Sequence, residues 1–231
     1  MSLPTIWTSH RVRWNFLGKL CASVPADPLM REAWIKARQP AVRPPHSRSL
    51  TEINEEVVAT LAEPDEEVGG LLVFQRVDGV CCMRAATIKA HLKDCARFLS
   101  SNYVGRIEGE KSFAVRVLNG VYPDPKNYWV PIRSQATGSP CQEATSRYDK
   151  AVHVQTRLGP RSAIKTIEYL GEARIEFTLL VMHDKKGKDV VSMDDLGTMM
   201  QYGGVHGYAG ERGDGEGRYT FTIEPLDGKD V

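Results

Sequence analysis

The chain has 231 residues, of which 42% are hydrophobic and 26% are charged. This content supports a sizeable core and excludes a generally disordered chain. The longest apolar run, Phe177–Met182, is far shorter than the roughly 18 residues that a membrane span needs. The N-terminal residues lack the basic flank and long apolar core of a secretory signal. We therefore expect a cytoplasmic globular protein without membrane association.

The formal net charge of +1 conceals a segregation of charge along the chain. Residues 1–48 carry eight basic and two acidic side chains, whereas residues 49–70 carry seven acidic side chains and no basic one. Residues 71–188 carry nineteen basic and eleven acidic side chains, and residues 189–231 carry three basic and nine acidic ones. Because local fields steer ligands, the basic segments could bind a polyanion while the acidic ones face a neighbouring subunit. The alternative is an ordinary solvated surface.

Neither the cysteines nor the histidines form a recognisable metal or cofactor motif. The five cysteines are odd in number and have no paired C-x-x-C spacing, so neither a disulfide framework nor a zinc site is expected. Cys21, Cys81 and Cys95 fall at apolar-periodic positions, which predicts buried reduced thiols. The six histidines show no H-x-H, H-x-x-x-H or H-E-x-x-H spacing. We therefore expect no metal and no cofactor.

The first half of the chain opens with a strand. A period of two over Arg11–Val24 predicts one buried and one polar face, and Pro25 ends this strand. Two short amphipathic stretches then make residues 25–70 a predicted helical insertion. The dipeptide Asp78-Gly79 lies between the apolar runs 71–76 and 80–83 and predicts a hairpin, because both central residues of a type I′ turn need positive φ. A strongly amphipathic helix follows over Thr87–Leu99, capped by Thr87.

The second half is predicted to be mostly strands. A strand pair is expected around Asn119-Gly120, and residues 123–150, rich in Pro, Gly and Ser, are predicted to be a long irregular loop insertion. Alternating segments on either side of Gly171 predict a second hairpin. Ser192 begins a helix through Tyr202, which Gly203 is expected to end. A last strand occupies residues 218–225.

This order of elements predicts the fold class. Without the insertions it reduces to β-α-β-β-α-β, the split βαβ arrangement. We therefore expect one α+β domain over residues 1–231, with a ferredoxin-like (RRM-like) antiparallel sheet and two core helices. The helical insertion at 25–70 and the loop insertion at 123–150 would be additions to this core.

The Gly-rich run Gly203–Arg218 is the strongest functional signal. It has seven glycines in sixteen positions, against an average usage of about 7%. Such a density points to close backbone approach, with N–H groups that form a nest for phosphates. The run is not a P-loop, because no Gly-Lys-Ser/Thr follows. The candidate contacts interleaved with the glycines are His206, Tyr208, Arg212 and Arg218, of which arginine binds phosphate and the rings stack on bases. The alternative is a flexible connection without a ligand.

A helix that ends in Gly203-Gly204, a Gly-rich loop with arginines, and Gly217-Arg218-Tyr219 entering a last strand resemble the C-terminal signature of the RAMP superfamily. These are repeat-associated, RRM-like proteins that include CRISPR backbone and processing subunits; small uncharacterised phage proteins have a similar ending. The opening strand and the helix that contains Ile88–Lys93 resemble other parts of that fold. The resemblance implies an RRM-like sheet that binds RNA, often in repeated subunits along a strand.

Other basic segments are needed beside the loop, since Glu211, Asp214 and Glu216 repel phosphate. One candidate is a helix face, one is a Gly-Pro turn between arginines with a following lysine, and one is a proline-rich segment that could lie along a phosphate backbone. The residues are Lys89, Lys93 and Arg97; Arg157, Arg161 and Lys165; and Arg43 and Arg48. A solvated surface is the alternative for each of these.

Three functions follow from these patterns. The leading hypothesis is a non-catalytic subunit that binds RNA or single-stranded nucleic acid, as a homo-oligomer or within a multi-subunit ribonucleoprotein. The second is a metal-independent endoribonuclease of the same fold, with His206 as a candidate for the general acid or base. The third is a phage structural or interaction protein without nucleic acid.

Overall fold

The computed structural model describes residues 6–27, 70–102, 111–156 and 159–226. The chain divides into two compact units, where the sequence was interpreted as one domain. The first unit contains Met1–Cys21, Gln75–Ala144 and Leu170–Val231, and the second contains Ala22–Phe74 and Thr145–Tyr169. Most of the expected helical insertion at 25–70 lies outside the described residues.

The first unit is an antiparallel sheet with the strand order β12-β1-β11-β8-β6-β5, in which β7 also pairs with β11. The strands are β1 (Trp7–Phe16), β5 (Gln75–Val77), β6 (Val80–Arg84), β7 (Val121–Pro123), β8 (Trp129–Ser134), β11 (Ala173–Met182) and β12 (Tyr219–Pro225). The short β2 (Leu20–Cys21) follows β1. Because α3 lies between β1 and β8 in sequence and α5 between β11 and β12, the four strands β12-β1-β11-β8 have the ferredoxin-like order. The predicted α+β fold class is confirmed.

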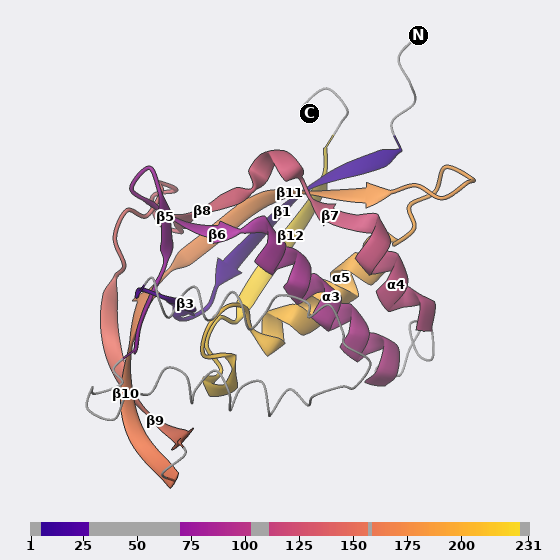
Figure 1. Cartoon of the computed structure of the whole chain (residues 1–231). Helices are drawn as coiled ribbons and strands as arrows, with labels where there is room; N and C mark the ends of the chain where they lie inside the picture. The colour runs from indigo at the N-terminus through magenta and orange to yellow at the C-terminus, as the bar shows by residue number, and fades with distance from the viewer. Residues whose placement is uncertain (1–5, 28–69, 103–110, 157–158, 227–231) are drawn as a thin grey trace. The chain divides into compact units, whose positions relative to one another are not determined.

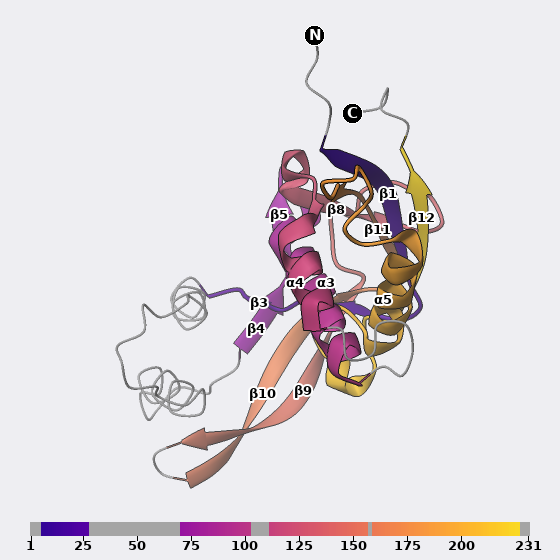
Figure 2. The same ribbon diagram turned by 90° about the vertical axis from the view of Figure 1, so that its right-hand side faces the viewer.

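The period of two in the first strand separates a covered face from an open one. Val12, Trp14 and Phe16 are buried, whereas Arg11 is exposed and Arg13 half-buried. Strand β11 continues the pattern, because Val12 lies opposite the buried Phe177. The three helices of the described part pack on the covered face, as Figures 1 and 2 show. Among the described residues, no helix covers the opposite, charged face of the sheet.

The helices are α3 (Ala85–Asn102), α4 (Lys111–Gly120) and α5 (Met193–His206), and short 3-10 turns occur at Pro125–Asn127 and Arg212–Asp214. Helix α3 buries the predicted stripe that begins at Ile88 and ends at Leu99. Thr87 does not cap it; the helix begins at Ala85, directly after β6, and the Thr87 hydroxyl donates to the Arg84 carbonyl (2.7 Å). Ser192 caps α5 as predicted, accepting a hydrogen bond from the Asp195 N–H.

Of two predicted turns, one is confirmed and the other is wrong. Asp78 and Gly79 have φ values of 49° and 77°, and Val77 lies opposite Val80, so the hairpin between β5 and β6 is confirmed. The strand pair around Asn119-Gly120 is wrong, because residues 111–120 form α4. Phe113 and Val117, one turn apart, are buried by that helix, and this spacing suits a helix as well as a strand.

Residues 123–150 and 163–182 also differ from the prediction. Part of the expected irregular insertion is β8, whose Val130 and Ile132 are buried in the sheet. The hairpin around Gly171 is wrong, since the strands on its two sides belong to different sheets. Apolar and polar residues alternate regularly in both strands, but the strand before Gly171 pairs with residues 146–156, which precede it in the chain.

The second unit is built around that strand, β10 (Gly159–Leu170). It pairs antiparallel with β9 (Ser146–Thr156) and parallel with β4 (Gly70–Val73), which in turn pairs with β3 (Val24–Pro25). The Glu168 carboxylate is buried there, where it accepts hydrogen bonds from Arg147 (2.9 Å) and from the backbone N–H of Phe74 (3.1 Å). A charge-assisted network thus holds this unit together.

Candidate nucleic-acid interface

The Gly-rich run is folded back onto the segment that follows β1. The Tyr208 N–H donates to the Gly217 carbonyl (2.9 Å), and the Gly217 N–H donates to the Lys19 carbonyl (2.9 Å). The Glu216 carboxylate accepts from the Lys19 N–H (3.2 Å) and lies 3.7 Å from the Lys19 ammonium. The Glu216 carboxylate is thus paired with Lys19 of the same chain. The run is an ordered loop with its own hydrogen bonds.

Packing explains several of the glycines. Helix α5 does not end at Gly203 but continues to His206, and Gly207 is its C-cap, with φ 85° and an N–H bond to the Gly203 carbonyl. A Cβ on Gly204 would collide with the backbone carbonyl of Tyr219. At Gly217, with φ 72°, a Cβ would collide with the backbone of Tyr208. Gly204 thus allows α5 to approach β12 closely, and Gly217 allows the loop to fold closely on itself, which accounts for these glycines without a phosphate nest.

Tyr208 is part of the core. Its side chain is 2% exposed, its ring packs edge-on against Trp14 (5.2 Å between centroids), and its hydroxyl hydrogen-bonds Thr87 (2.6 Å). Burial raises the pKa of this phenol. A base cannot stack on a ring that is enclosed in this way. The expected stacking role of Tyr208 is therefore replaced by an internal one.

A buried histidine joins α3 to β12 beneath the loop. His91 Nε2 lies 3.0 Å from the Tyr219 hydroxyl, and its ring packs edge-on against Trp14. Burial, assisted by the nearby positive charges of Arg212 and His206, lowers the pKa of His91 to about 3. His91 is therefore neutral near pH 7. It belongs to the structure of the site rather than to its exposed surface.

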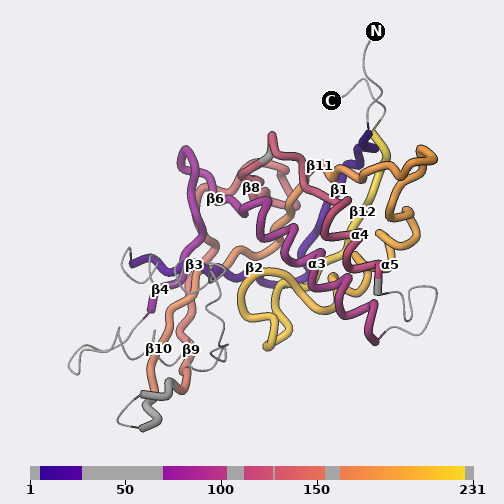
Figure 3. Tube along the Cα trace, turned by 45° about the vertical axis from the view of Figure 1, so that its right-hand side comes forward, coloured from indigo at the N-terminus to yellow at the C-terminus, as the bar shows by residue number. Residues whose placement is uncertain are grey.

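Above this core, three rings form a ladder on the outer side of α3 and α5. Phe98 of α3 stacks on Tyr202 of α5 with 4.5 Å between centroids and 10° between planes. Tyr202 stacks in turn on His206, one helical turn later, at 5.5 Å and 13°. Figures 1 and 3 show α3 and α5 side by side, which brings the rings together. We call Phe98, Tyr202 and His206 the aromatic ladder.

The ladder is accessible and ends at a cation. Phe98 is 46% exposed and His206 is exposed at the end of α5. A guanidinium nitrogen of Arg212 lies 3.5 Å from His206 Nε2, so the loop places a planar positive group beside the last ring. The exposed faces of stacked rings bind further π-systems, and a guanidinium binds phosphate or stacks on a base. The structure thus brings together His206 and Arg212 from the predicted contacts.

The helix face predicted from Lys89, Lys93 and Arg97 is only partly available. Lys89 Nζ donates to the carbonyls of Val117 (2.7 Å) and Val121, and it lies 3.9 Å from the centre of the Tyr122 ring. Burial, assisted by the charge of Lys93, lowers the pKa of Lys89 to about 8. Lys89 therefore holds the end of α4 rather than a phosphate.

Lys93 and Arg97, the next two cations on α3, lie closer in sequence to Phe98 of the ladder. Lys93 is half-buried, and the exposed Arg97 forms a loose ion pair with Asp94 at 4.0 Å. Both side chains of this pair are more than half exposed, so its stabilising effect is small. Arg97 immediately precedes Phe98 and keeps its guanidinium available to an anion.

The remaining predicted residues lie elsewhere. Arg218 is exposed at the start of β12, where it borders a groove between β12 and α5. Lys165 lies on β10 in the second unit, opposite Lys150 of β9. Arg161 lies on the same strand, and its side chain is not among those described. The predicted contacts outside the described residues are Arg43, Arg48 and Arg157.

The cysteines and acidic residues show no metal site in the described ranges. All five cysteines are free; Cys21, Cys81, Cys82 and Cys95 are buried, as predicted for three of them. Across the part of the chain that the structure describes, no group of three His, Cys, Asp or Glu side chains is placed to hold a metal ion. Among the same residues, no helix has the length and apolar character of a membrane span.

Sequence reasoning missed Phe98 and Tyr202. Phe98 was placed on neither face of its helix, and Tyr202 was only the expected end of α5. One signal was available, because Tyr202 and His206 are four residues apart and so share a helix face. The contact between Tyr202 and Phe98 joins residues about a hundred positions apart, and no local pattern reveals it.

Comparisons with known proteins identify no family for the chain. No protein-family model matches the sequence, and no curated protein matches it. One similar solved structure is described as a cryo-EM structure of the Type III-B Cmr-beta bound to cognate target RNA. Its chain has a TM-score of 0.46 and 11% sequence identity, and the alignment covers 96% of this chain. This chain spans 61% of that one.

Proposed function

We propose that this protein is a non-catalytic subunit that binds RNA or another single-stranded nucleic acid. The observation that carries the proposal is the aromatic ladder, a nearly parallel stack in which Phe98 and His206 are exposed, Tyr202 is half-buried between them, and Arg212 lies at one end. Single-stranded nucleic acids present bases that are free to stack, whereas the bases of a duplex are already stacked on one another. A stacking platform next to a guanidinium suits that ligand.

Phosphate contacts around the ladder would come from a small set of cations. Arg212 and Arg97 have exposed guanidinium groups, and Lys93 lies one helical turn before Arg97. Glu216 does not oppose them, because Lys19 already pairs with it. Each neutralised phosphate of a single strand changes the slope of log affinity against log salt by about −0.7. We therefore expect binding that weakens as salt is raised, with a slope that corresponds to a few phosphates.

The proposal is non-catalytic because His206 lacks the partner that acid–base chemistry needs. Its ring contacts Tyr202 and Arg212, and within the described residues no carboxylate accepts a hydrogen bond from it. A general acid or base works best when another group orients it and adjusts its pKa. RNA incubated with the protein and separated on a denaturing gel should stay intact. Cleavage that disappears in His206→Ala would instead favour the endoribonuclease.

Assembly into a multi-subunit particle is the second part of the proposal. The sequence alternates basic and acidic segments, which allows one subunit's acidic surface to meet another's basic surface. A subunit that contacts only a few nucleotides gains affinity when copies or partners bind one strand together. Protein purified from cells should therefore carry nuclease-sensitive nucleic acid, seen as a raised 260/280 nm absorbance ratio.

The test compares single-stranded RNA binding by matched variants, measured by fluorescence anisotropy at fixed salt. Tyr202 is the ring on which both Phe98 and His206 pack, so Tyr202→Ala should disrupt the platform on which a base stacks. Stacking contributes about 1–3 kcal/mol per base, so this variant should weaken binding by about five- to a hundredfold. Tyr128→Ala is the control, since Tyr128 is a surface tyrosine that packs against Arg84 at the other end of α3. Equal affinities for these two variants would reject the ladder as the binding surface. No binding by wild-type protein would reject the function and favour a structural role.

A further inference from the structure

Strand β12 forms the outer edge of the sheet and leaves part of its backbone unpaired. On its inner side the Leu17 N–H donates to the Arg218 carbonyl (2.8 Å), and the Leu226 N–H donates to the Ser9 carbonyl (2.8 Å). Because an antiparallel strand alternates, the polar backbone groups of Phe221 and Ile223 point away from β1. No strand of the described part pairs with that side.

This edge lacks the features that normally prevent pairing with another strand. Soluble proteins protect such edges with lysine, proline or a bulge. Residues 220–223 are instead Thr-Phe-Thr-Ile, and Pro225 occurs only at the last position of the strand. Residues of this type favour strands and pair well across a sheet.

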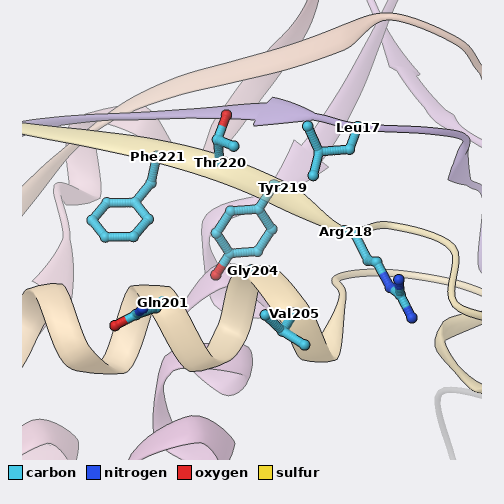
Figure 4. Close-up of a pocket in the computed structure, with 8 residues that line it drawn as sticks. All are labelled: Leu17, Gln201, Gly204, Val205, Arg218, Tyr219, Thr220 and Phe221. Carbon is cyan, nitrogen blue, oxygen red and sulfur yellow. The ribbon is translucent and has the colours of Figure 1, made fainter.

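An apolar groove of about 430 Å³ runs beside the edge, between β12 and α5. Figure 4 shows Phe221 and Tyr219 pointing towards α5, where Gln201 lies nearest Phe221 and Val205 lies nearer Tyr219 and Arg218. Val205 is 70% exposed and Leu17 is 68% exposed, which leaves two large apolar side chains in water. Apolar surface next to an unpaired strand edge is typical of a site for an added strand.

We propose that the occupant is a second copy of this chain, whose β12 pairs antiparallel with β12 of the first. Placing Phe221 opposite Phe221 of the second copy sets Arg218 opposite Glu224 and Thr220 opposite Thr222, each twice. Side chains two residues apart point to the same face of a strand. Arg218, Thr220, Thr222 and Glu224 therefore all lie on one face of the sheet. The strand is therefore complementary to itself in charge.

The two-fold axis of this arrangement lies at Phe221, so the same patch meets itself. Both copies of Phe221 exchange their outward N–H···O=C bonds. The two grooves adjoin each other across the axis, and each copy contributes its exposed Val205 to the interface. Tyr219 contributes less, since its carbonyl already lies against Gly204 of α5. The pairing is thus short and centred on residues 220–224. The aromatic ladder is not part of it, so dimer formation does not depend on the proposed binding of nucleic acid.

The test is analytical ultracentrifugation of nuclease-treated protein from low to high micromolar concentration. We expect a monomer–dimer equilibrium, and we expect Val205→Lys to raise its dissociation constant by about tenfold or more, because a lysine would be buried at the interface. Val115→Lys is the matched control: Val115 is also a valine on a helix and 53% exposed, but it lies on α4. This variant should dimerise like wild type.

The register has its own test. Arg218→Glu should weaken the dimer, because it places two carboxylates opposite each other, and adding Glu224→Arg should restore it. Glu224 also lies opposite Arg11 of β1, so thermal unfolding must show that each variant is folded. A wild-type monomer at every concentration would overturn the proposal. A dimer that survives both Val205→Lys and Arg218→Glu would overturn it too, since another surface would then be responsible.

Discussion

At the scale of single residues, the glycines of the Gly-rich run divide into two kinds. Gly203 and Gly204 lie inside α5 and touch β12 and α3, whereas a methyl group added to Gly213 would meet no other atom within 4 Å. From the density of glycine we expected close backbone approach to a phosphate. The partner in that approach is the protein's own Tyr219, which sequence alone does not reveal.

This division predicts opposite effects for two alanine substitutions in the same helix. Gly204→Ala should lower the free energy of unfolding by about 1–3 kcal/mol, because its methyl group meets the Tyr219 backbone. Gly197→Ala should raise it by about 0.5–1 kcal/mol, because no atom lies within 4 Å and alanine favours a helix. Urea unfolding measures both. Equal effects would show that α5 does not contact β12 as described.

His91 predicts how stability depends on pH. Its pKa is about 3 in the folded state and about 6.5 in the unfolded chain, so between these values the unfolded state binds more protons. The free energy of unfolding should then fall as pH falls, by about 1.4 kcal/mol for each unit below 6.5. His91→Gln should have a shallower pH dependence over this window. Parallel urea-unfolding curves for the two proteins from pH 7 to pH 5 would contradict this assignment.

At the scale of elements, Lys89 has a structural role, although its positive charge led us to predict a phosphate contact. Its ammonium donates to the Val117 and Val121 carbonyls at the end of α4, where carbonyls lack helical partners. Lys89→Ala should therefore lower the melting temperature, whereas Lys93→Ala, on the same helix, should leave it nearly unchanged. Differential scanning fluorimetry provides the comparison. A lower affinity for RNA in Lys89→Ala without any loss of stability would return Lys89 to the binding surface.

Local signals predicted the elements whose causes are local. The alternation in β1, the Asp78-Gly79 turn, the stripe of α3 and the Ser192 cap each depend on residues close in sequence, and each is present. Helix α4 was missed because Asn119-Gly120 is a strong turn signal at its end. The partner of β10 was missed because two regularly alternating strands around Gly171 look like a hairpin. Which strand pairs with which is decided by distant parts of the chain.

At the scale of the whole molecule, the ferredoxin-like sheet explains how the ladder is formed. Its two long crossover helices, α3 and α5, pack side by side on one face, so Phe98 meets Tyr202 and His206. The loop that links α5 to the last strand then places Arg212 beside His206. Fold class and Gly-rich loop were predictable from the sequence. The ladder was not, because it exists only once the two helices are packed.

Ultraviolet cross-linking of the protein to a uridine-rich single-stranded RNA, followed by mass spectrometry of the peptides, tests the central claim most directly. Stacked bases cross-link to the rings that they touch, so the account predicts adducts on Phe98, Tyr202 or His206 and their loss in Tyr202→Ala. High salt should reduce the yield at these positions as binding weakens. Adducts confined to other parts of the chain, such as the open face of the sheet around Arg11 and Arg13, or no adducts at all, would contradict it.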